Sequence, residues 1–168
     1  MTRPDPVYDA ERLQEIVNLG LLEPDVGPLL HDIAERAAAA LGQPVSLVSV
    51  VLDEALHVAS AAGVAGMWMT DVGGHPLEWS FCKTSVQTRE AFVVPNAVED
   101  PVHRDNPLVT IDGVRCYAGV PMISSRGYVL GNLCVVGVEP RSFSENEMAT
   151  LRTLAAEAVS RLEARRKP

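Results

Sequence analysis

Three cysteines are the residues of this chain that could support thiol chemistry. Cys82, Cys116 and Cys134 are widely spaced and form no C-x-x-C pair, so the sequence contains no dithiol motif and no zinc-finger spacing. A catalytic thiol needs a nearby cation or helix N-terminus to lower its pKa, and only Cys82, near the start of a predicted short helix, meets that condition. A buried cysteine commonly acts as a small hydrophobe, and that interpretation is favoured for all three.

Four histidines are the other candidates for metal chemistry. They show no i, i+4 pair and no cysteine at metal-ligand spacing. His31 and His57 fall on a predicted helix and strand, where a hydrogen-bonded structural role is the default. His75 and His103 fall in predicted loops, and either could ligate haem iron, although a structural role is favoured for both. The histidines therefore identify no metal site, and the cofactor stays unknown.

The elements that would position these side chains follow from hydrophobic periodicity, which predicts an antiparallel sheet between terminal helices. Helices are expected at Tyr8–Leu19, Pro28–Leu41, Phe81–Thr88 and after the capping box Ser144-Glu145-Asn146-Glu147. Strands are expected at Val45–Leu52, Leu56–Ala62, Phe92–Val94, Arg115–Ile123 and Tyr128–Val136. Residues 63–79 and 96–113 are expected to be loops. This order predicts an α+β fold with the terminal helices on one sheet face and the loops on the other.

The predicted hairpin around Ser124–Gly127 has two chemically different faces. If Ile123 pairs with Tyr128, one face carries polar groups and the other is apolar or sulfur-bearing. The first comprises Arg115, Tyr117, Gly119, Asn132 and Cys134, and the second Cys116, Ala118, Val120, Met122, Val129, Leu133 and Val135. Buried polar groups need partners, which a ligand pocket would supply. Alternatively, Arg115 and Asn132 tie down the loops through backbone carbonyls. The register also predicts that Cys116 and Cys134 cannot form a disulfide.

The two loops carry the remaining site candidates. Trp68, Trp79 and Phe81 could line an apolar pocket for a planar ligand, because aromatic residues make up only 5% of the chain and gather there. Cys82, next to Phe81, is a further candidate for this pocket. Equally, they could fill the cavity themselves. Asn96, Asp100 and Asn106 could orient a ligand, but asparagine and aspartate beside proline are ordinary turn formers.

Composition restricts the function classes. A net charge of −8 disfavours nonspecific binding to nucleic acid or anionic lipid. No apolar run has the length of a membrane span, and the first residues do not resemble a secretory signal. Unpaired cysteines indicate a reducing compartment, so a cytoplasmic location is expected. The length suits a single domain over residues 1–168, with a lead-in at 1–7 and a tail at 163–168.

Several segments resemble GAF domains of the bacterial sensor type. The matching segments are Trp79–Val86, Phe92–Ala97, Asp100–Val109, Arg115–Pro121 and Val129–Val136, with Glu11–Leu13 and Leu19–Leu22 as the lead-in. The resemblance implies an antiparallel sheet with the terminal helices on one side and a pocket closed by the middle helix and loops on the other. It also implies a non-catalytic sensory or regulatory module that binds an unidentified small molecule, dimerises, or does both in signal transduction.

Specific activities of the family can be compared with the sequence. The Asn-Lys…Phe…Asp-Glu arrangement associated with cyclic nucleotides is absent, and neither Cys82 nor Cys116 is followed by the histidine typical of covalent bilin attachment. The alternative is a thiol-dependent reductase of the free methionine sulfoxide type, since that enzyme uses three cysteines and three are present here. The Ser-Glu-Ile that follows the nucleophilic cysteine of that reductase is missing.

Apolar positions beyond the needs of one sheet face predict a homodimer through the terminal helices, or docking on a separate signalling protein. They are Leu13, Ile16, Val17, Leu151, Val159 and Leu162.

Overall fold

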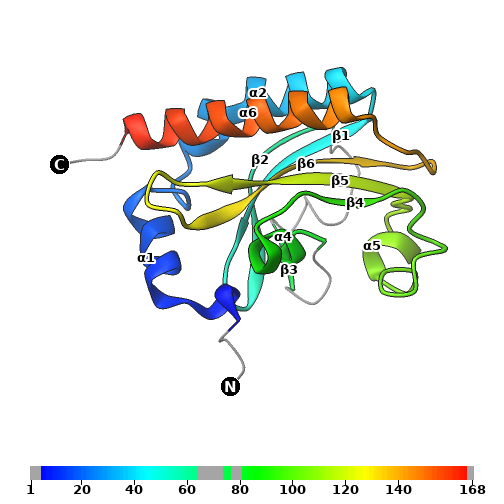
Figure 1. Ribbon diagram of the computed structural model, residues 1–168, viewed down its shortest axis with the longest axis horizontal. Helices are drawn as coiled ribbons and strands as arrows, with labels where there is room; N and C mark the ends of the chain where they lie inside the picture. Colours follow the sequence, from blue (N-terminus) through cyan, green and yellow to red (C-terminus); the bar gives the residue numbers. More distant parts are fainter. Residues whose placement is uncertain (1–4, 64–73, 77–80, 166–168) are drawn as a thin grey trace.

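The computed structural model describes residues 5–63, 74–76 and 81–165, which build an antiparallel sheet between a helical layer and a layer of short elements (Figure 1). The sheet has six strands in the order β3-β2-β1-β6-β5-β4. The strands are β1 (Val45–Val51), β2 (Ala55–Ala62), β3 (Gly74–Pro76), β4 (Phe92–Val94), β5 (Cys116–Ile123) and β6 (Val129–Gly137). The helices are η1 (Pro6–Tyr8), α1 (Ala10–Asn18), α2 (Val26–Leu41), α4 (Lys83–Thr88), α5 (Pro107–Thr110) and α6 (Glu145–Ala164). The predicted α+β class is confirmed.

The two long helices lie side by side across one face of the sheet, and α4 and α5 lie on the other (Figure 1). Local sequence fixes their ends. Gly42 adopts φ 62° and stops α2, and the Ser144 hydroxyl and Glu147 carboxylate form the predicted capping box of α6. Within the described residues, no helix has both the length and the apolar character that crossing a bilayer would require.

Three predicted segments differ from the structure. The loop expected over residues 63–79 contains the three-residue strand β3, and the other two differences concern helix starts. The helix expected over Tyr8–Leu19 is a 3-10 turn followed by α1, because Asp9 is extended and its carboxylate caps α1 through the amide of Glu11. The loop expected over 96–113 contains α5, which starts where Asn106 accepts a hydrogen bond from the amide of Leu108 and a proline occupies the first turn. Both starts use ordinary capping chemistry in segments too short to show a helical period.

The hairpin of β5 and β6 keeps its predicted faces but not its predicted register. Ile123 pairs with Val129 instead of Tyr128, and an irregularity between Met122 and Ile123 then shifts the pairing so that Tyr117 lies opposite Val136. The extra residue turns the side chain of Val129 to the loop side, where it joins the pocket-side core, so its expected place beneath the helices is wrong. The other apolar members of the second face, from Ala118 to Val135, pack against α2 and α6 as expected, while Cys116 lies beside Gln43.

The surplus of apolar side chains on the terminal helices is not observed. Ile16, Leu151 and Leu162 are fully buried in the core between sheet and helices, Val159 is buried and Leu13 packs against the same core. Val17 alone among the six is exposed, at 60% of its surface. The residues from which a homodimer was expected are therefore used within the chain, because the sheet needs two long helices and α1 to cover it.

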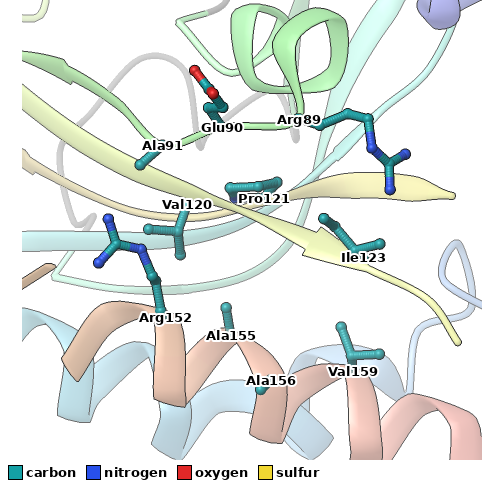
Figure 2. Close-up of a pocket in the computed structure, with 10 residues that line it drawn as sticks. All are labelled: Arg89, Glu90, Ala91, Val120, Pro121, Ile123, Arg152, Ala155, Ala156 and Val159. Carbon is teal, nitrogen blue, oxygen red and sulfur yellow. The ribbon is translucent and has the colours of Figure 1, made fainter. Parts of the chain in front are cut away.

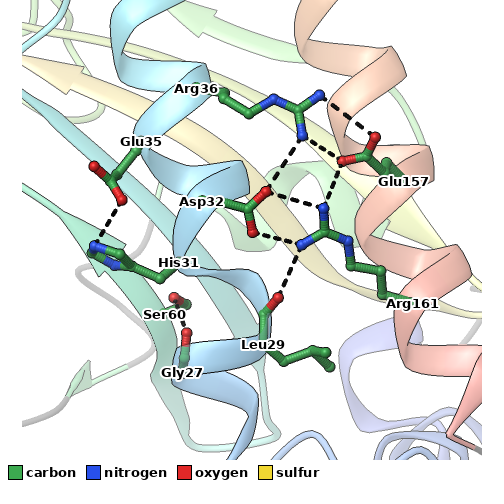
Figure 3. Close-up of polar contacts among 9 residues, drawn as sticks. All are labelled: Gly27, Leu29, His31, Asp32, Glu35, Arg36, Ser60, Glu157 and Arg161. Carbon is green, nitrogen blue, oxygen red and sulfur yellow. Dashed lines mark hydrogen bonds and ion pairs between the residues drawn. The ribbon is translucent and has the colours of Figure 1, made fainter.

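The outer surface of the helical layer is held by ion pairs instead (Figure 3). Arg161 of α6 contacts Asp32 of α2 at 2.6 Å, and Arg36 of α2 contacts Glu157 of α6 at 2.6 Å. The hydrogen bond from Arg161 lowers the pKa of Asp32 to about 2. These pairs are exposed, so each is worth little alone, but together they cross-link the two helices.

The N-terminal segment is attached to the sheet by one buried cation. The guanidinium of Arg12, 2% exposed, donates to the backbone oxygens of Pro6, Val7 and Val129. Burial lowers the pKa of Arg12 from its usual value. Three carbonyl acceptors compensate for the removal of this charge from water, so Arg12 ties η1 to the start of β6.

Candidate functional site

The candidate pocket lies between the loop-side face of the sheet and the segments that carry α4 and α5. Its described walls are mostly apolar and enclose only about 20 Å³, room for about one water molecule. They are Leu47, Leu56, Phe81, Cys82, Leu108, Val114, Tyr117, Cys134 and Val136. In this conformation side chains fill the space on the loop-side face where the hairpin pattern predicted a ligand pocket.

Four predicted residues meet on the pocket side of the sheet as a buried polar cluster. The Oη of Tyr117 lies 3.1 Å from the Sγ of Cys82 and accepts a hydrogen bond from the Nδ2 of Asn132 at 3.1 Å. The thiol of Cys134 also shares a hydrogen bond with Cys82. We call Cys82, Tyr117, Asn132 and Cys134 the polar cluster. Its members come from β5, β6 and the N-cap of α4, so it joins the sheet to the covering layer.

The electrostatics of the polar cluster favour its neutral forms. Burial raises the pKa of Tyr117 well above its usual value, and the neighbouring Cys82 and Cys134 act in the same direction. The hydrogen bond with Cys82, followed by burial, raises the pKa of the Cys134 thiol. A thiol held in its protonated form is a weak nucleophile. The raised pKa values of Tyr117 and Cys134 therefore favour hydrogen bonding by the neutral phenol and thiol.

One polar atom of the cluster is left over. Asn132 has no exposed surface, and its Oδ1 has no hydrogen-bond partner within the described parts of the chain. An unmade hydrogen bond on a buried amide costs about 1–3 kcal/mol. Gly119 makes the arrangement possible, since a Cβ there would collide with the phenol of Tyr117 and crowd the Nδ2 of Asn132.

An aromatic stack extends the pocket wall toward the loops. The ring of Phe81 lies 5.0 Å from that of Tyr117 in a stacked arrangement and 4.3 Å from that of His103. Phe92 also contacts His103, at 5.8 Å. His103 is buried, and its burial lowers its pKa, which favours the neutral imidazole. His103 therefore serves as a packing element of the wall, in agreement with the structural role favoured from sequence.

Four other predicted site residues lie outside the pocket walls. Arg115 donates to the backbone oxygens of Val109 and Val114, which is the loop-tying alternative. Asp100 accepts from the amide of Val102, and Asn106 caps α5, so both act as turn formers. Asn96 lies after the end of β4 and is not among the described wall residues. The remaining candidates, Trp68 and Trp79, lie outside the described residues.

Several wall residues were not among the predicted site residues. Leu47 and Leu56 come from β1 and β2, and their inward direction was available from strand alternation. Leu108 lies in α5 and Val114 follows that helix, and no periodicity marked them because the segment is so short. Apolar wall positions resemble core positions in sequence, so only the fold separates the two.

The third cysteine is separate from the polar cluster. Cys116 is fully buried, its Sγ lies 3.5 Å from the Oε1 of Gln43, and burial raises the pKa of its thiol. None of the three cysteines forms a disulfide, which confirms the prediction that Cys116 and Cys134 do not pair.

Comparison with known proteins gives the family. Residues 25–162 match the GAF domain family. The chain is a GAF domain. A curated relative, the cyclic di-GMP phosphodiesterase PA2567 of Pseudomonas aeruginosa, is 30% identical over 163 residues. That match covers 96% of this chain and only 27% of the relative, so the GAF domain spans about a quarter of the protein it matches.

Solved structures show the same fold at low identity. The GAF domain of an Acinetobacter phosphoenolpyruvate-protein phosphotransferase superposes with a TM-score of 0.68 at 19% identity, over 93% of this chain and 95% of that one. A type II free methionine-R-sulfoxide reductase from Thermoplasma acidophilum gives 0.59 at 15% identity, over 81% and 96%. These likenesses establish the GAF fold and carry no activity with them.

Proposed function

We propose that this GAF domain is a non-catalytic sensory or regulatory module that binds a small molecule at the polar cluster. The observation that carries the proposal is the buried amide of Asn132. Its Nδ2 donates to the pocket-wall residue Tyr117, and its Oδ1 has no hydrogen-bond partner among the described residues. A binding site that is apolar with a few converging polar groups has this composition. A ligand that donates a hydrogen bond to Oδ1 would remove the cost of leaving it unsatisfied.

The size of the pocket defines how such a ligand would enter. Because about 20 Å³ holds no more than a water molecule, binding requires the covering layer to move outward. That layer contains two short helices, the six-residue α4 and the four-residue α5. Elements with few buried contacts open at lower free energy than the central strands. The stacked rings of Phe81 and Tyr117 favour a compact, planar and mainly apolar ligand.

Native mass spectrometry and an absorption spectrum of freshly purified protein test this proposal. We expect a bound small molecule, or a compound from a small-molecule library that raises the melting temperature. That signal should be lost in Asn132→Leu, while Cys116→Ser, a buried change away from the cluster, should retain it. A bare mass with no stabilising compound would contradict the binding role and leave interaction as the function.

The burial of the thiols supports the non-catalytic part of the proposal. Cys82 is 4% exposed, and Cys116 and Cys134 are fully buried, so a reductase substrate would meet no accessible sulfur in this conformation. We expect no reduction of free methionine sulfoxide coupled to thiol consumption. Activity that disappears in Cys82→Ser and persists in Cys116→Ser would instead establish the reductase alternative.

Output through a homodimer or a separate signalling protein is a further part of the proposal. The outer surface of α2 and α6 is polar and cross-linked by ion pairs, so a dimer through these helices would be sensitive to salt. Sedimentation at high protein concentration in low and high salt tests this, and a monomer in both would contradict it. The unbridged thiols support a cytoplasmic location.

A further inference from the structure

A second hollow lies away from the polar cluster, at the sheet edge next to α6 (Figure 2). It has a volume of about 660 Å³, far larger than the interior pocket, and runs between α6 and the outer part of β5. We call it the α6 groove, lined by Arg89, Glu90, Ala91, Val120, Pro121, Ile123, Arg152, Ala155, Ala156 and Val159. It exists because β4 pairs only with residues 117–119 of β5 and leaves the rest of that strand without a neighbour on its outer side.

The floor of the α6 groove consists of small and medium-sized apolar side chains. Figure 2 shows Val120 and Ile123 on the strand side, with Ala155 and Val159 on the helix side. From Arg152 to Val159 the helix rises about 10 Å, which is about two turns. A groove of this length with alanines in its floor allows another helix to approach closely, as in helix-in-groove recognition.

The strand edge beside the groove does not favour an added strand. The backbone of Asn132 faces β1, where its amide and carbonyl both bond to the hydroxyl of Ser49. In antiparallel alternation its partner Pro121 therefore directs its backbone to the outer edge, where proline has no amide hydrogen to donate. An extended peptide would lack a ladder hydrogen bond at this position, so a helical occupant is favoured over an extended one.

The two ends of the groove are cationic in an acidic protein. The chain has a net charge of −8. Arg161 of α6 and Arg165 at its C-cap are paired with carboxylates. Arg152 has no hydrogen-bond or ion-pair partner among the described residues. Arg89 donates to the backbone oxygen of Gly127 at 2.7 Å and, within the same residues, to no carboxylate. The groove lining also contains one carboxylate, Glu90, which forms no ion pair with either arginine among the described residues. Two guanidinium groups against one carboxylate leave the groove with a net positive charge.

We propose that the α6 groove docks an acidic amphipathic helix of a partner protein. Apolar side chains of that helix fill the floor between Val120 and Val159, and carboxylates at its flanks pair with Arg152 and Arg89. Arginine beside an apolar floor is a usual composition for the centre of an interface. The groove is lined by other residues than the polar cluster, so a failure of this interaction would not contradict ligand binding in the interior pocket.

The test uses a labelled 15-residue helical peptide with leucines at i, i+3, i+4 and i+7 and glutamates on its flanks. Fluorescence anisotropy measures its affinity for the intact chain, and amide chemical shifts map its position. We expect the double variant Arg89→Asn/Arg152→Glu to bind at least about tenfold more weakly. Asparagine is chosen because Arg89 has φ 63°, which asparagine tolerates. The matched control Arg126→Glu, at an exposed turn outside the groove, should bind within about twofold of wild type.

A second variant separates shape from charge. Ala156→Trp places a ring in the groove from an exposed position of α6, and it should weaken peptide binding while the fold, followed by circular dichroism, stays intact. Equal binding of a peptide with lysines in place of the glutamates would overturn the proposal, as would no binding to wild type or shifts mapped elsewhere. A dimer in sedimentation that Ala156→Trp abolishes would also overturn it, because the occupant would then be a second copy.

Discussion

Tyr117 and Asn132 project from neighbouring strands and share a hydrogen bond of 3.1 Å, with the phenol of Tyr117 lying over the backbone of Gly119. The bond joins β5 to β6 through side chains on the pocket face, in addition to their backbone ladder. It also orients the amide of Asn132 within the polar cluster. The geometry of the candidate site therefore depends on a residue that has no side chain.

Gly119→Ala should destabilise the domain by about 1–3 kcal/mol, because the new methyl group forces Tyr117 out of its position. Urea unfolding measures the loss. Gly27→Ala is the matched control, since a Cβ there meets nothing closer than 3.5 Å and helix α2 favours alanine. Equal stabilities of the two variants would show that the phenol can move freely and that Gly119 does not fix the cluster.

Replacing the buried cation Arg12 by alanine should lower the free energy of unfolding by about 2–4 kcal/mol, because three backbone oxygens lose a charged donor. Arg12→Lys should retain only part of this free energy of unfolding, since an ammonium group lacks the planar fork that reaches separate acceptors. Arg152→Ala serves as the control and should change stability little. Hydrogen exchange should rise around η1 and the start of β6 in the alanine variant, and unchanged exchange there would contradict the tethering role.

Acid should weaken the link between α2 and α6. The pKa of Asp32 is lowered to about 2 by Arg161, and that of Glu157 is lowered by Arg36. A lowered folded-state pKa gives stability that is complete above the unfolded value, near pH 4, and is lost as the pH falls toward 2. The urea midpoint of wild type should therefore fall over this range more steeply than that of Asp32→Asn. Identical profiles, in low salt where screening is weak, would show that the pair contributes nothing.

Alkali should act on the opposite side of the molecule. Because the pKa of Tyr117 is raised by burial, its neutral form is stabilised by folding, and this contribution is complete below about pH 10 and lost at higher pH. In a spectroscopic titration, the phenol of Tyr117 should ionise only when the chain unfolds. Tyr117→Phe should remove that late step from the absorbance curve, and a wild-type curve without a step at unfolding would contradict the burial of the phenol.

Much of the fold follows from sequence, because long elements have clear periods. The alternation in β1 correctly predicts that both of its faces are covered, and Ser144 with Glu147 correctly marks the start of α6. The hairpin faces were also correct, since side-chain alternation survives a shift of two residues. The irregularity near Ile123 was not predictable, because nothing in the residue types signals the extra residue that turns Val129 over.

Site residues were predictable from sequence only where a polar side chain falls on the pocket face of a strand. Tyr117, Asn132 and Cys134 were placed on one face by alternation. The contact of Cys82 with Tyr117 was not predictable, because it depends on how α4 packs against the sheet. Arg115 has the same alternation but takes no part in the polar cluster. It precedes β5, and its long side chain reaches back to the loop carbonyls. Sequence patterning gives the direction of a Cβ, and a long side chain can end elsewhere.

The sheet is a single layer with a different occupant on each side. Along β5 and β6, each residue that faces the polar cluster is followed by one that faces the helices, as in Tyr117 and Ala118 or Asn132 and Leu133. Consecutive Cα atoms are separated by only 3.8 Å. The floor of the pocket and the surface on which α6 packs are therefore the two faces of the same strands. We expect a displacement of the backbone at the pocket floor to shift α6 directly, because no other side-chain layer lies between the strands and that helix.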